Sequence, residues 1–425
     1  MKSFKKKRTH AKLFTGLFIT VLLIILIQFG DSFCMGLYDK MQSYILTDFL
    51  ISRHGFSENS AAGYLSLFML PCYAITATAP AVRALSDKYG KSRILFINIV
   101  LLLTGCSLSI FSSSLVLFLI GNALITFSCT MDLQNLYIAE DIPYQYRGTM
   151  SGLTQAISSC AAMTIPLLRT ILIERYQYGW RSIYMVAFIG TILLLISASI
   201  LLKIRNYNPP RKENAATAPS QSPRFKDIFQ FLRNQTTIRS YLILLLILGI
   251  ATPGITFYNE PVLSFTLTDS ASINRILLIQ PLTTLVFTFL NGMLADRFQR
   301  MRVITADIMI SLLFILCFTI TLHTSASPAV LGIAWGIMVG AYFAAIELIS
   351  LTIIEQIPHH NIGKFSALST YAYGFGDAVG MLIISLLTLK VQMDVSKLLL
   401  ALPIFIIALT FIFMIHHPSS RFPSR

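Results

Sequence analysis

Charged side chains are scarce in this 425-residue chain, in which Asp, Glu, Lys and Arg together make up 12% of the residues. Soluble globular domains carry about 25% charged residues. Hydrophobic residues account for 55% of the chain. A composition so poor in charge and so rich in apolar side chains excludes a soluble globular protein of this length, and it indicates a chain that lies in a lipid bilayer.

The sequence also lacks the short motifs that organise cofactors and catalytic groups. Its six cysteines lie scattered through apolar runs without a Cys-x-x-Cys pair, and its seven histidines are not clustered, so neither a disulfide framework nor a metal site is indicated. It contains no phosphate-binding Gly-Lys-Ser/Thr loop and no Ser, His and Asp in a catalytic order. We therefore expect a protein that is not an enzyme and that uses no cofactor.

Long apolar runs fill most of the chain instead. A helix needs about 20 apolar residues to cross roughly 30 Å of hydrocarbon, and runs of this length recur from end to end. We predict an all-α membrane protein with twelve transmembrane helices, at residues 13–47, 60–82, 94–113, 115–138, 148–173, 181–202, 240–264, 274–293, 303–323, 328–350, 364–389 and 395–415. The first run is too long for a secretory signal, so we expect it to remain as a helix.

Basic residues are distributed unevenly between the two sides that these spans define. The chain carries 33 Lys and Arg against 19 Asp and Glu, a net charge of +14. If both termini lie in the cytoplasm, 25 of the 33 basic residues fall in cytoplasmic segments, as the positive-inside rule requires. The charge therefore reports topology rather than nucleic-acid binding. It predicts a multi-pass protein of a plasma membrane, and the short chain without a soluble domain favours a bacterial one.

Two polar turns occur twice along the chain at nearly the same offset. Residues 85–93 read LSDKYGKSR and residues 294–302 read LADRFQRMR, which places their aspartates 209 positions apart. Residues 140–148 read EDIPYQYRG and residues 355–363 read EQIPHHNIG, at an offset of 215 positions. Two segments with similar offsets imply a duplicated unit of roughly two hundred residues, the internal symmetry on which secondary transporters are built.

The repeated turns resemble the loop signatures between helices two and three and between helices eight and nine of the major facilitator superfamily. GWRSIY at residues 179–184 and the Glu-x-x-Pro-x-x-x-Arg-Gly turn are also similar to that family. The resemblance implies two pseudo-symmetric six-helix bundles that rock about a central site, a small-molecule solute, contact with lipid and a monomer. We expect the halves at 1–202 and 240–425, joined by a cytoplasmic connector at 203–239 whose helical stretch lies either on the membrane surface or on the protein.

The resemblance further implies that the repeated turns form a charge latch, a cluster that closes the cytoplasmic side. Its predicted members are Asp87, Lys91, Arg93, Glu140, Arg147, Asp296, Arg297, Arg300 and Glu355. The first copy has Arg83 where the pattern has a small residue, and the second has Gln299 in place of a glycine and Ile362 in place of an arginine. We therefore expect an uneven latch. The alternative is that the basic residues only hold these loops in the cytoplasm.

Polar side chains inside the spans are candidates for the solute or proton pathway, because ionisable groups in a bilayer are costly and face a cavity or a partner. The predicted set is Gln28, Asp31, Asp39, Asp132, Tyr258, Asn259, Glu260, Glu347, Tyr371 and Asp377. The alternative for each carboxylate is a structural hydrogen bond to a neighbour. Weaker candidates, of types that more often serve packing, are Gln155, Arg169, Gln280 and Trp335.

Together these features predict a secondary transporter that works by alternating access. Embedded carboxylates outnumber embedded cations, which favours coupling to protons, with Asp31 and Asp377 as the preferred carriers. The fifth span contains Pro166 without the flanking glycines of the family's drug antiporters. That difference favours uptake of a polar metabolite, such as a sugar or a related compound. A proton antiporter that exports drugs or cationic amphiphiles is the alternative, and a non-transporting membrane sensor is a third reading.

Overall fold

The computed structural model describes residues 2–76, 78–79, 82, 89–131, 133–143, 147–207, 233, 235–257, 259–267, 269–324, 327–356, 367–391 and 395–416. At residues 2–15 and at some further positions it describes the backbone alone. Within the described ranges the chain is helical almost throughout and contains no strand.

The helices before the connector begin at the N-terminus with one that is 39 residues long. In chain order they are α1 (Lys2–Lys40), α2 (Gln42–Leu46), η1 (Thr47–Ile51), α3 (Ser52–His54), α4 (Glu58–Thr76), α7 (Lys91–Phe111), α8 (Leu115–Thr130), α9 (Leu133–Asp141), α10 (Arg147–Leu168), η3 (Arg169–Arg175) and α11 (Arg181–Tyr207). The segments labelled η are short π-helical stretches that continue the neighbouring α-helices.

The helices after the connector include five long ones, α15 to α20, that follow a broken first helix. They are α13 (Thr236–Thr252), η4 (Pro253–Phe257), α14 (Asn259–Thr266), α15 (Ser270–Arg297), α16 (Arg300–His323), α17 (Pro328–Gln356), α19 (Ala367–Lys390) and α20 (Val395–His416). Among the described residues, nine helices are long and apolar enough to cross a membrane, and α8 and α20 contain shorter apolar stretches. Each of the twelve predicted spans coincides with a helix or with consecutive helices, so the predicted all-α membrane fold is confirmed.

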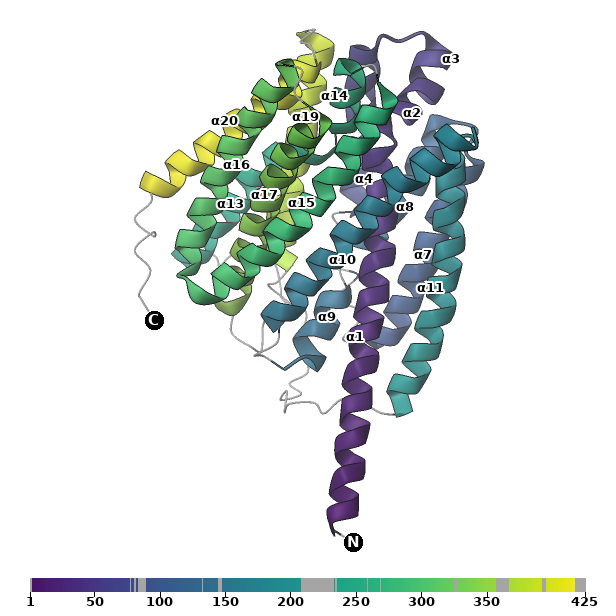
Figure 1. Cartoon of the computed structure of the whole chain (residues 1–425), viewed down its shortest axis with the longest axis vertical. Coiled ribbons are helices and arrows are strands. Elements are labelled where there is room, and N and C mark those ends of the chain that lie inside the picture. The colour runs from purple at the N-terminus through teal and green to yellow at the C-terminus, as the bar shows by residue number, and fades with distance from the viewer. Residues whose placement is uncertain are drawn as a thin grey trace.

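The helices form two groups that lie side by side (Figure 1). In the N-terminal bundle, α1 packs on α10 and α11, and α7 packs on α8 and α11; in the C-terminal bundle, α17 packs on α15 and α16, and α13 packs on α19 and α20. The most extensive contacts between the bundles are those of α10 with α15 and of α4 with α19. In the second pair the Ser385 hydroxyl donates to the carbonyl oxygen of Gly63 at 2.9 Å.

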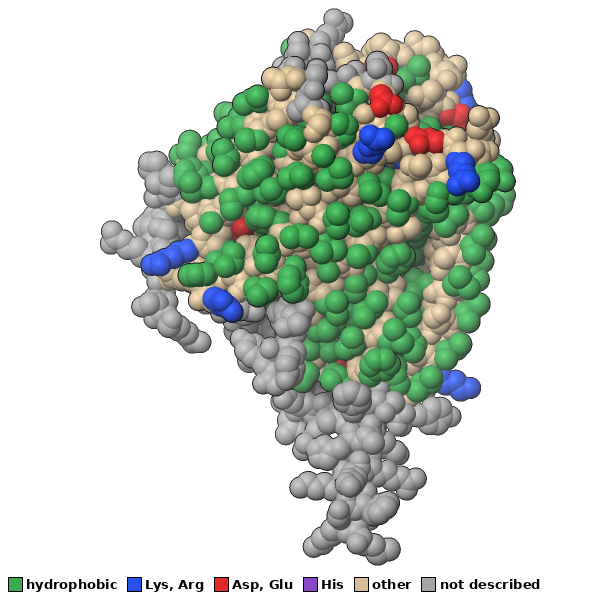
Figure 2. All heavy atoms as spheres, in the orientation of Figure 1, with side chains coloured by type: hydrophobic (Ala, Val, Ile, Leu, Met, Phe, Trp, Pro, Cys, Tyr) green, Lys and Arg blue, Asp and Glu red, His purple; other side chains and the backbone are tan. Residues whose placement is uncertain are grey.

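The outer surface of the bundles is apolar over a broad band. Figure 2 shows hydrophobic side chains covering most of the visible face, with Lys, Arg, Asp and Glu gathered toward its ends. Large exposed side chains in this band include Phe111, Leu193, Phe289 and Ile320. An apolar belt between charged ends matches the hydrocarbon layer of a bilayer between its two aqueous faces.

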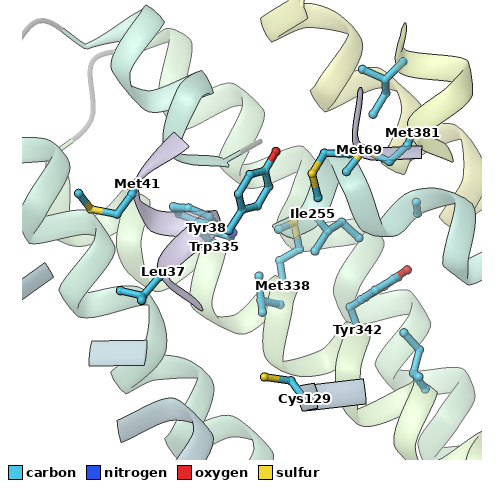
Figure 3. Close-up of a cluster of buried hydrophobic side chains, with 14 of the residues drawn as sticks. Leu37, Tyr38, Met41, Met69, Cys129, Ile255, Trp335, Met338, Tyr342 and Met381 are labelled. Atoms are coloured by element: carbon cyan, nitrogen blue, oxygen red, sulfur yellow. The ribbon is translucent and has the colours of Figure 1, made fainter. Parts of the chain in front are cut away.

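Buried hydrophobic side chains from both bundles meet in one cluster. Figure 3 shows Leu37 and Tyr38 of α1 beside Trp335 of α17, and nearby Met69 of α4 and Met381 of α19. All five side chains are at most 3% exposed. In this cluster side chains from α1, α4, α17 and α19 lie close together.

Helices α13 and α19 approach so closely that side chains are excluded from their contact. A Cβ atom at Gly376 would overlap the carbonyl oxygen of Leu246, and one at Gly249 would overlap that of Tyr373. Only glycine allows backbones to come this near. The contact positions Asp377, because its backbone nitrogen lies 3.1 Å from the point that a Gly249 Cβ would occupy.

Candidate functional site

A buried ion pair joins the two bundles at the distal end, by which we mean the end farthest from the N-terminus in Figure 1. Arg169 Nη1 in η3 donates to Glu260 Oε1 in α14 at 3.0 Å. The side chains are 3% and 0% exposed. Burying two charges is costly unless their remaining hydrogen-bonding atoms are also satisfied, so the surroundings of the pair decide whether it stabilises the contact.

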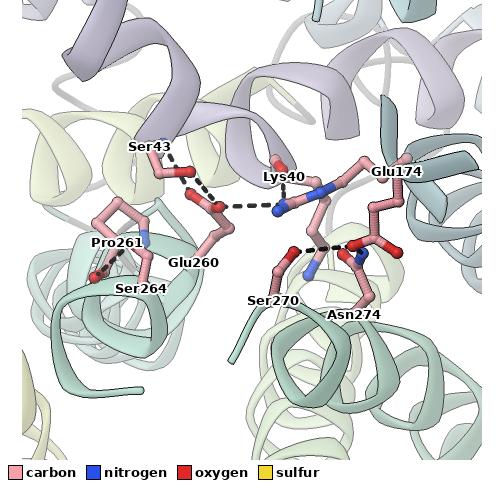
Figure 4. Close-up of polar contacts among 9 residues, drawn as sticks. Lys40, Ser43, Glu174, Glu260, Pro261, Ser264, Ser270 and Asn274 are labelled. Carbon is pink, nitrogen blue, oxygen red and sulfur yellow. Dashed lines mark hydrogen bonds and ion pairs between the residues drawn. The ribbon is translucent and has the colours of Figure 1, made fainter. Parts of the chain in front are cut away.

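The last residue of α1, Lys40, and the short helix α2, which contains Ser43 and Tyr44, supply most of those surroundings. The Ser43 backbone N–H and hydroxyl donate to the two carboxylate oxygens of Glu260 at 2.8 and 2.5 Å. Arg169 Nη1 also donates to the Lys40 carbonyl oxygen at 2.6 Å, and its guanidinium lies 5.0 Å from the centre of the Tyr44 ring. Figure 4 shows the Glu260 carboxylate beside Ser43. We call these residues the distal network.

Local departures from regular α-helix place the two charges. Pro166 lies three residues before Arg169, and the π-helical turn η3 begins at Arg169. On the other bundle Pro253 opens η4, and α14 starts just before Glu260. A proline removes a backbone donor, and single π turns inside helices are frequent at functional sites. Both members of the ion pair therefore project from helix breaks rather than from continuous helices.

A second polar contact reinforces the same end of the molecule. Glu174, in η3, accepts hydrogen bonds from the Ser270 hydroxyl at 2.8 Å and from the Asn274 amide. Ser270 and Asn274 lie in the first turns of α15, as Figure 4 shows. Together with Arg169, Glu174 makes η3 one of the elements that join the N-terminal bundle to the C-terminal bundle at the distal end.

Lys40 extends from the last turn of α1 toward the C-terminal bundle. Its Nζ donates to Gln280 Oε1 in α15 at 3.2 Å and lies 5.0 Å from the centre of the Trp335 ring in α17. The Gln280 amide nitrogen donates in turn to the Thr284 hydroxyl at 3.1 Å. Three helices from both bundles thus converge on one ammonium group.

Uncharged polar groups lie farther along α1 and α10, toward the N-terminus. Gln28 Nε2 donates to the Ser32 hydroxyl at 3.0 Å and to the Ser158 hydroxyl at 2.9 Å. On α10, Gln155 Nε2 donates to Glu347 Oε1 in α17 at 3.3 Å. Glu347 is exposed although 72% of the apolar window of α17 is buried. Because its partner belongs to the other bundle, Glu347 faces the region between the bundles.

The remaining predicted carboxylates of the spans are enclosed. Asp31 is 5% exposed, and its carbonyl oxygen accepts from the Cys129 thiol at 3.2 Å. Asp377 is 6% exposed, and its Oδ1 has no hydrogen-bond partner among the described residues. The Oδ1 of Asp39 is in the same situation. Unpaired buried carboxylate oxygens are unusual and mark places where a proton or a ligand completes the hydrogen bonding.

Three hydroxyl groups of the C-terminal bundle form a hydrogen-bonded group near Asp377. Thr252 Oγ1 in α13 lies 2.9 Å from the Tyr342 hydroxyl and donates to the Tyr373 hydroxyl at 3.0 Å. Tyr373 lies one turn before Asp377 in α19, and Tyr371, another predicted pathway residue, is 37% exposed. The arrangement provides a chain of proton donors and acceptors beside a buried carboxyl group.

The predicted cytoplasmic latch lies largely beyond what the structure describes. Asp87, Asp132 and Tyr258 are outside the described residues, and at five other predicted positions only the backbone is described: Glu140, Arg147, Asn259, Asp296 and Glu355. Of the predicted basic members, Arg93 and Arg297 are exposed, whereas Lys91 and Arg300 are partly buried. The latch therefore stays a prediction.

One ion pair near the predicted latch was not anticipated from the sequence. Arg205 Nη2 in α11 donates to Asp141 Oδ2 at 2.5 Å, and its Nε donates to the Thr20 hydroxyl at 3.3 Å. The Tyr137 ring lies 5.0 Å from the Arg205 guanidinium and 5.8 Å from Lys91 Nζ. These contacts tie α1, α9, α11 and the start of α7 together. Asp141 follows Glu140 directly, so the repeated turn at residues 140–148 already contained this carboxylate.

Comparison with known proteins agrees with the helical architecture. The sequence model of the Major Facilitator Superfamily matches residues 14–381. Over 118 residues the chain is 27% identical to "Glucose transporter GlcP" of Staphylococcus epidermidis. The aligned segment covers 26% of this chain and 25% of that relative. The aligned part thus spans about a quarter of the relative's length.

Solved structures match over nearly the whole chain. A D-xylose-proton symporter superposes with a TM-score of 0.70 at 16% identity, covering 95% of this chain and 98% of the other. The xylose transporter XylE from E. coli, in a partially occluded inward-open conformation, superposes with a TM-score of 0.70 at 15% identity, covering 96% and 99%. At identities this low the similarity establishes the fold alone.

Proposed function

This chain belongs to the major facilitator superfamily of membrane transporters, and from that premise we propose that it takes up a small polar solute, a sugar or a related compound, together with protons. The observation that carries the proposal is a set of hydrogen-bonding groups inside the spans: Gln28, Ser32 and Ser158 join α1 and α10 within the N-terminal bundle, and Gln155 with the exposed Glu347 joins the two bundles. Amide and hydroxyl groups suit the many hydroxyls of a polyol. The glucose and xylose transporters named above support the same substrate class.

The mechanism follows from where the bundles are joined. With both termini in the cytoplasm of a bacterial cell, as the basic residues indicate, the distal end faces outward, and the distal network closes the outer side. Rocking of the bundles would then require the Arg169–Glu260 pair to open while the cytoplasmic latch around Asp87 and Asp296 forms. Halves at 1–202 and 240–425 would move as units about the connector at 203–239.

Proton coupling is assigned to the enclosed carboxylates. Asp377 carries an unpaired oxygen beside the hydroxyls of Tyr342, Thr252 and Tyr373, and Asp31 lies in α1 one turn after Gln28. A carboxyl group in this position takes up a proton when it faces one side of the membrane and releases it at the other. The carboxamide of Asn has the same shape and cannot carry a proton.

Reconstituted vesicles test the proposal. With an acidic exterior, labelled xylose or glucose should accumulate above equilibrium, and a protonophore should collapse the accumulation. Asp377→Asn should abolish accumulation while leaving exchange between labelled and unlabelled solute, because exchange needs no net proton movement. Asp48→Asn, which alters a carboxylate at the distal surface, serves as the control and should transport normally. Absence of flux for every polyol and sugar derivative tried would refute the proposed function.

Export of cationic amphiphiles is the second candidate, because Glu347 is an exposed carboxylate between the bundles that could attract a cation. The same vesicles distinguish the two. An antiporter would alkalinise an acidic lumen when a cationic dye is added outside, whereas a symporter would acidify the lumen when solute is added. Dye-driven alkalinisation without sugar flux would favour export.

A further inference from the structure

Lys40 is a charged group between the bundles for which no carboxylate partner is found among the described residues. Its ammonium group contacts one neutral amide oxygen, that of Gln280, and the face of Trp335. The nearest buried carboxylate that could neutralise it is already committed, because Glu260 accepts two hydrogen bonds from Ser43 and one from Arg169. Asp39 is adjacent in sequence and its negative charge acts on Lys40, as that of Glu260 does, but no ion pair between Asp39 and Lys40 is found among the described residues.

The position of Lys40 is deep enough to matter for a solute. Gln280 lies ten residues into α15 and Trp335 seven residues into α17. At 1.5 Å per residue these contacts lie about 15 Å and about 10 Å below the helix starts. Trp335 is 1% exposed and its Nε1 has no acceptor among the described residues. Two donors, an ammonium and an indole N–H, therefore occur together in a low-dielectric region, and among the described residues no carboxylate forms an ion pair with the ammonium.

A cation in such a region is normally paired or serves a function. The ammonium here has hydrogen-bonding capacity left over, since it has three N–H groups and one hydrogen bond is found. A charged acceptor satisfies it better than a neutral one, because charge-assisted hydrogen bonds are roughly twice as strong. The same charge repels a cationic solute.

We propose that Lys40 selects an anionic solute, a polyol that carries a carboxylate or another acidic group, over the neutral sugar of the same shape. This inference rests on the proposed uptake of a sugar-like solute and narrows its chemical class. The acidic group binds at Lys40, next to Gln280 and the Trp335 indole, and the hydroxyls of the solute extend toward the amide and hydroxyl groups of α1 and α10.

Binding to the purified full-length protein tests the inference separately from transport. D-Glucuronate and D-glucose are the matched probes, since they differ in one carboxylate, and their affinities are measured by calorimetry at pH 7. Glucuronate should bind at least about tenfold more tightly, a difference of about 1.4 kcal/mol. Lys40→Gln should remove that preference, Lys40→Arg should retain most of it, and Lys390→Gln, which alters an exposed lysine at the end of α19, should leave it unchanged.

The outcomes separate the two claims. If both probes bind equally and neutral sugar is transported, the selectivity assignment is wrong and the proposed function stands. If glucuronate binds through Lys40 but no probe is transported, the assignment stands and the transport proposal is wrong. A Lys40→Gln protein that no longer elutes as a monodisperse species is replaced by Lys40→Met in the same measurement. The inference would be overturned if Lys40→Gln and Lys40→Met bound glucuronate over glucose with the same preference as the wild type and Lys40→Arg.

Discussion

Arg169 and Glu260 determine, at the level of single side chains, how firmly the bundles join at the distal end. Each is almost fully buried, and they form an ion pair with each other. We expect Arg169→Met or Glu260→Met alone to destabilise the protein by about 3–5 kcal/mol, because either change strands one buried charge. The double variant should lose less stability than the two single variants lose when their losses are added. Thermal unfolding in detergent, monitored by size-exclusion recovery, measures all three.

A surface pair supplies the control for this cycle. Arg53 and Asp48 lie 3.3 Å apart with side chains 42% and 26% exposed, and exposed pairs contribute at most about 1 kcal/mol. Arg53→Gln should therefore change the unfolding temperature little. Additive losses in the Arg169 and Glu260 variants would show that the two charges do not stabilise one another.

The sequence indicated Glu260 as a functional residue more clearly than Arg169. Glu260 was predicted for the pathway and Arg169 was a weaker candidate, because a lone arginine in a span has several explanations. Their separation of 91 positions gave no reason to pair them. The useful signal was that an embedded arginine needs a counter-ion, and Glu260 was one of a few embedded carboxylates in the other half.

Among the helices, α15 has the clearest local determinant of where it begins. Asp269 accepts hydrogen bonds from the Ser272 hydroxyl at 2.6 Å, the Ala271 N–H at 3.1 Å and the Ser272 N–H at 3.1 Å. These bonds, that of the Ser272 hydroxyl foremost, hold the pKa of the Asp269 carboxyl below its ordinary value. The ionised cap satisfies backbone donors that the helix cannot.

The stability that this cap contributes should depend on pH. Because the pKa is lower in the folded than in the unfolded protein, the contribution is complete above the ordinary Asp value and is lost as the pH falls through the folded value. Asp269→Ala should lower the melting temperature at pH 7, and the difference from wild type should shrink toward pH 3. Asp269→Asn keeps a capping oxygen without the charge, so its difference from wild type at pH 7 should be smaller than that of Asp269→Ala. A difference between Ala and wild type that is constant with pH would contradict this account.

The contact of α13 with α19 is the second test at the level of elements. Gly376→Val places a branched side chain where even a Cβ overlaps the Leu246 carbonyl, so the helices must separate. Overpacking of this kind typically costs about 1–3 kcal/mol. Proton-driven accumulation should fall as well, because Asp377 shifts with its helix. Gly374 lies two residues earlier in α19, and nothing lies within 4 Å of the position of a Cβ atom there. Gly374→Val should therefore be tolerated. Equal effects of the two variants would refute the close α13–α19 contact as the cause.

The whole molecule should transport only if its distal end can open. Glu174 and Ser270 contact each other across the bundles at 2.8 Å. In a Cys160→Ser background, which removes the exposed native cysteine, Glu174→Cys with Ser270→Cys should be joined by a short bis-methanethiosulfonate cross-linker, which forms a disulfide with each cysteine and is released by reduction. Transport should stop after cross-linking and return after reduction, and each single cysteine variant should be unaffected by the reagent. Undiminished transport in the cross-linked protein would show that this end does not open.

Helix positions and fold class were predictable from the sequence because they depend on local properties. Apolar length decides which segments cross the bilayer, basic residues decide the side of each loop, and the repeated turns at offsets of 209 and 215 residues disclose the duplication. None of these properties reports which side chains meet across the bundles. Lys40 contacts Gln280 and Trp335, residues 240 and 295 positions away, and only packing of α1 against α15 and α17 brings them together.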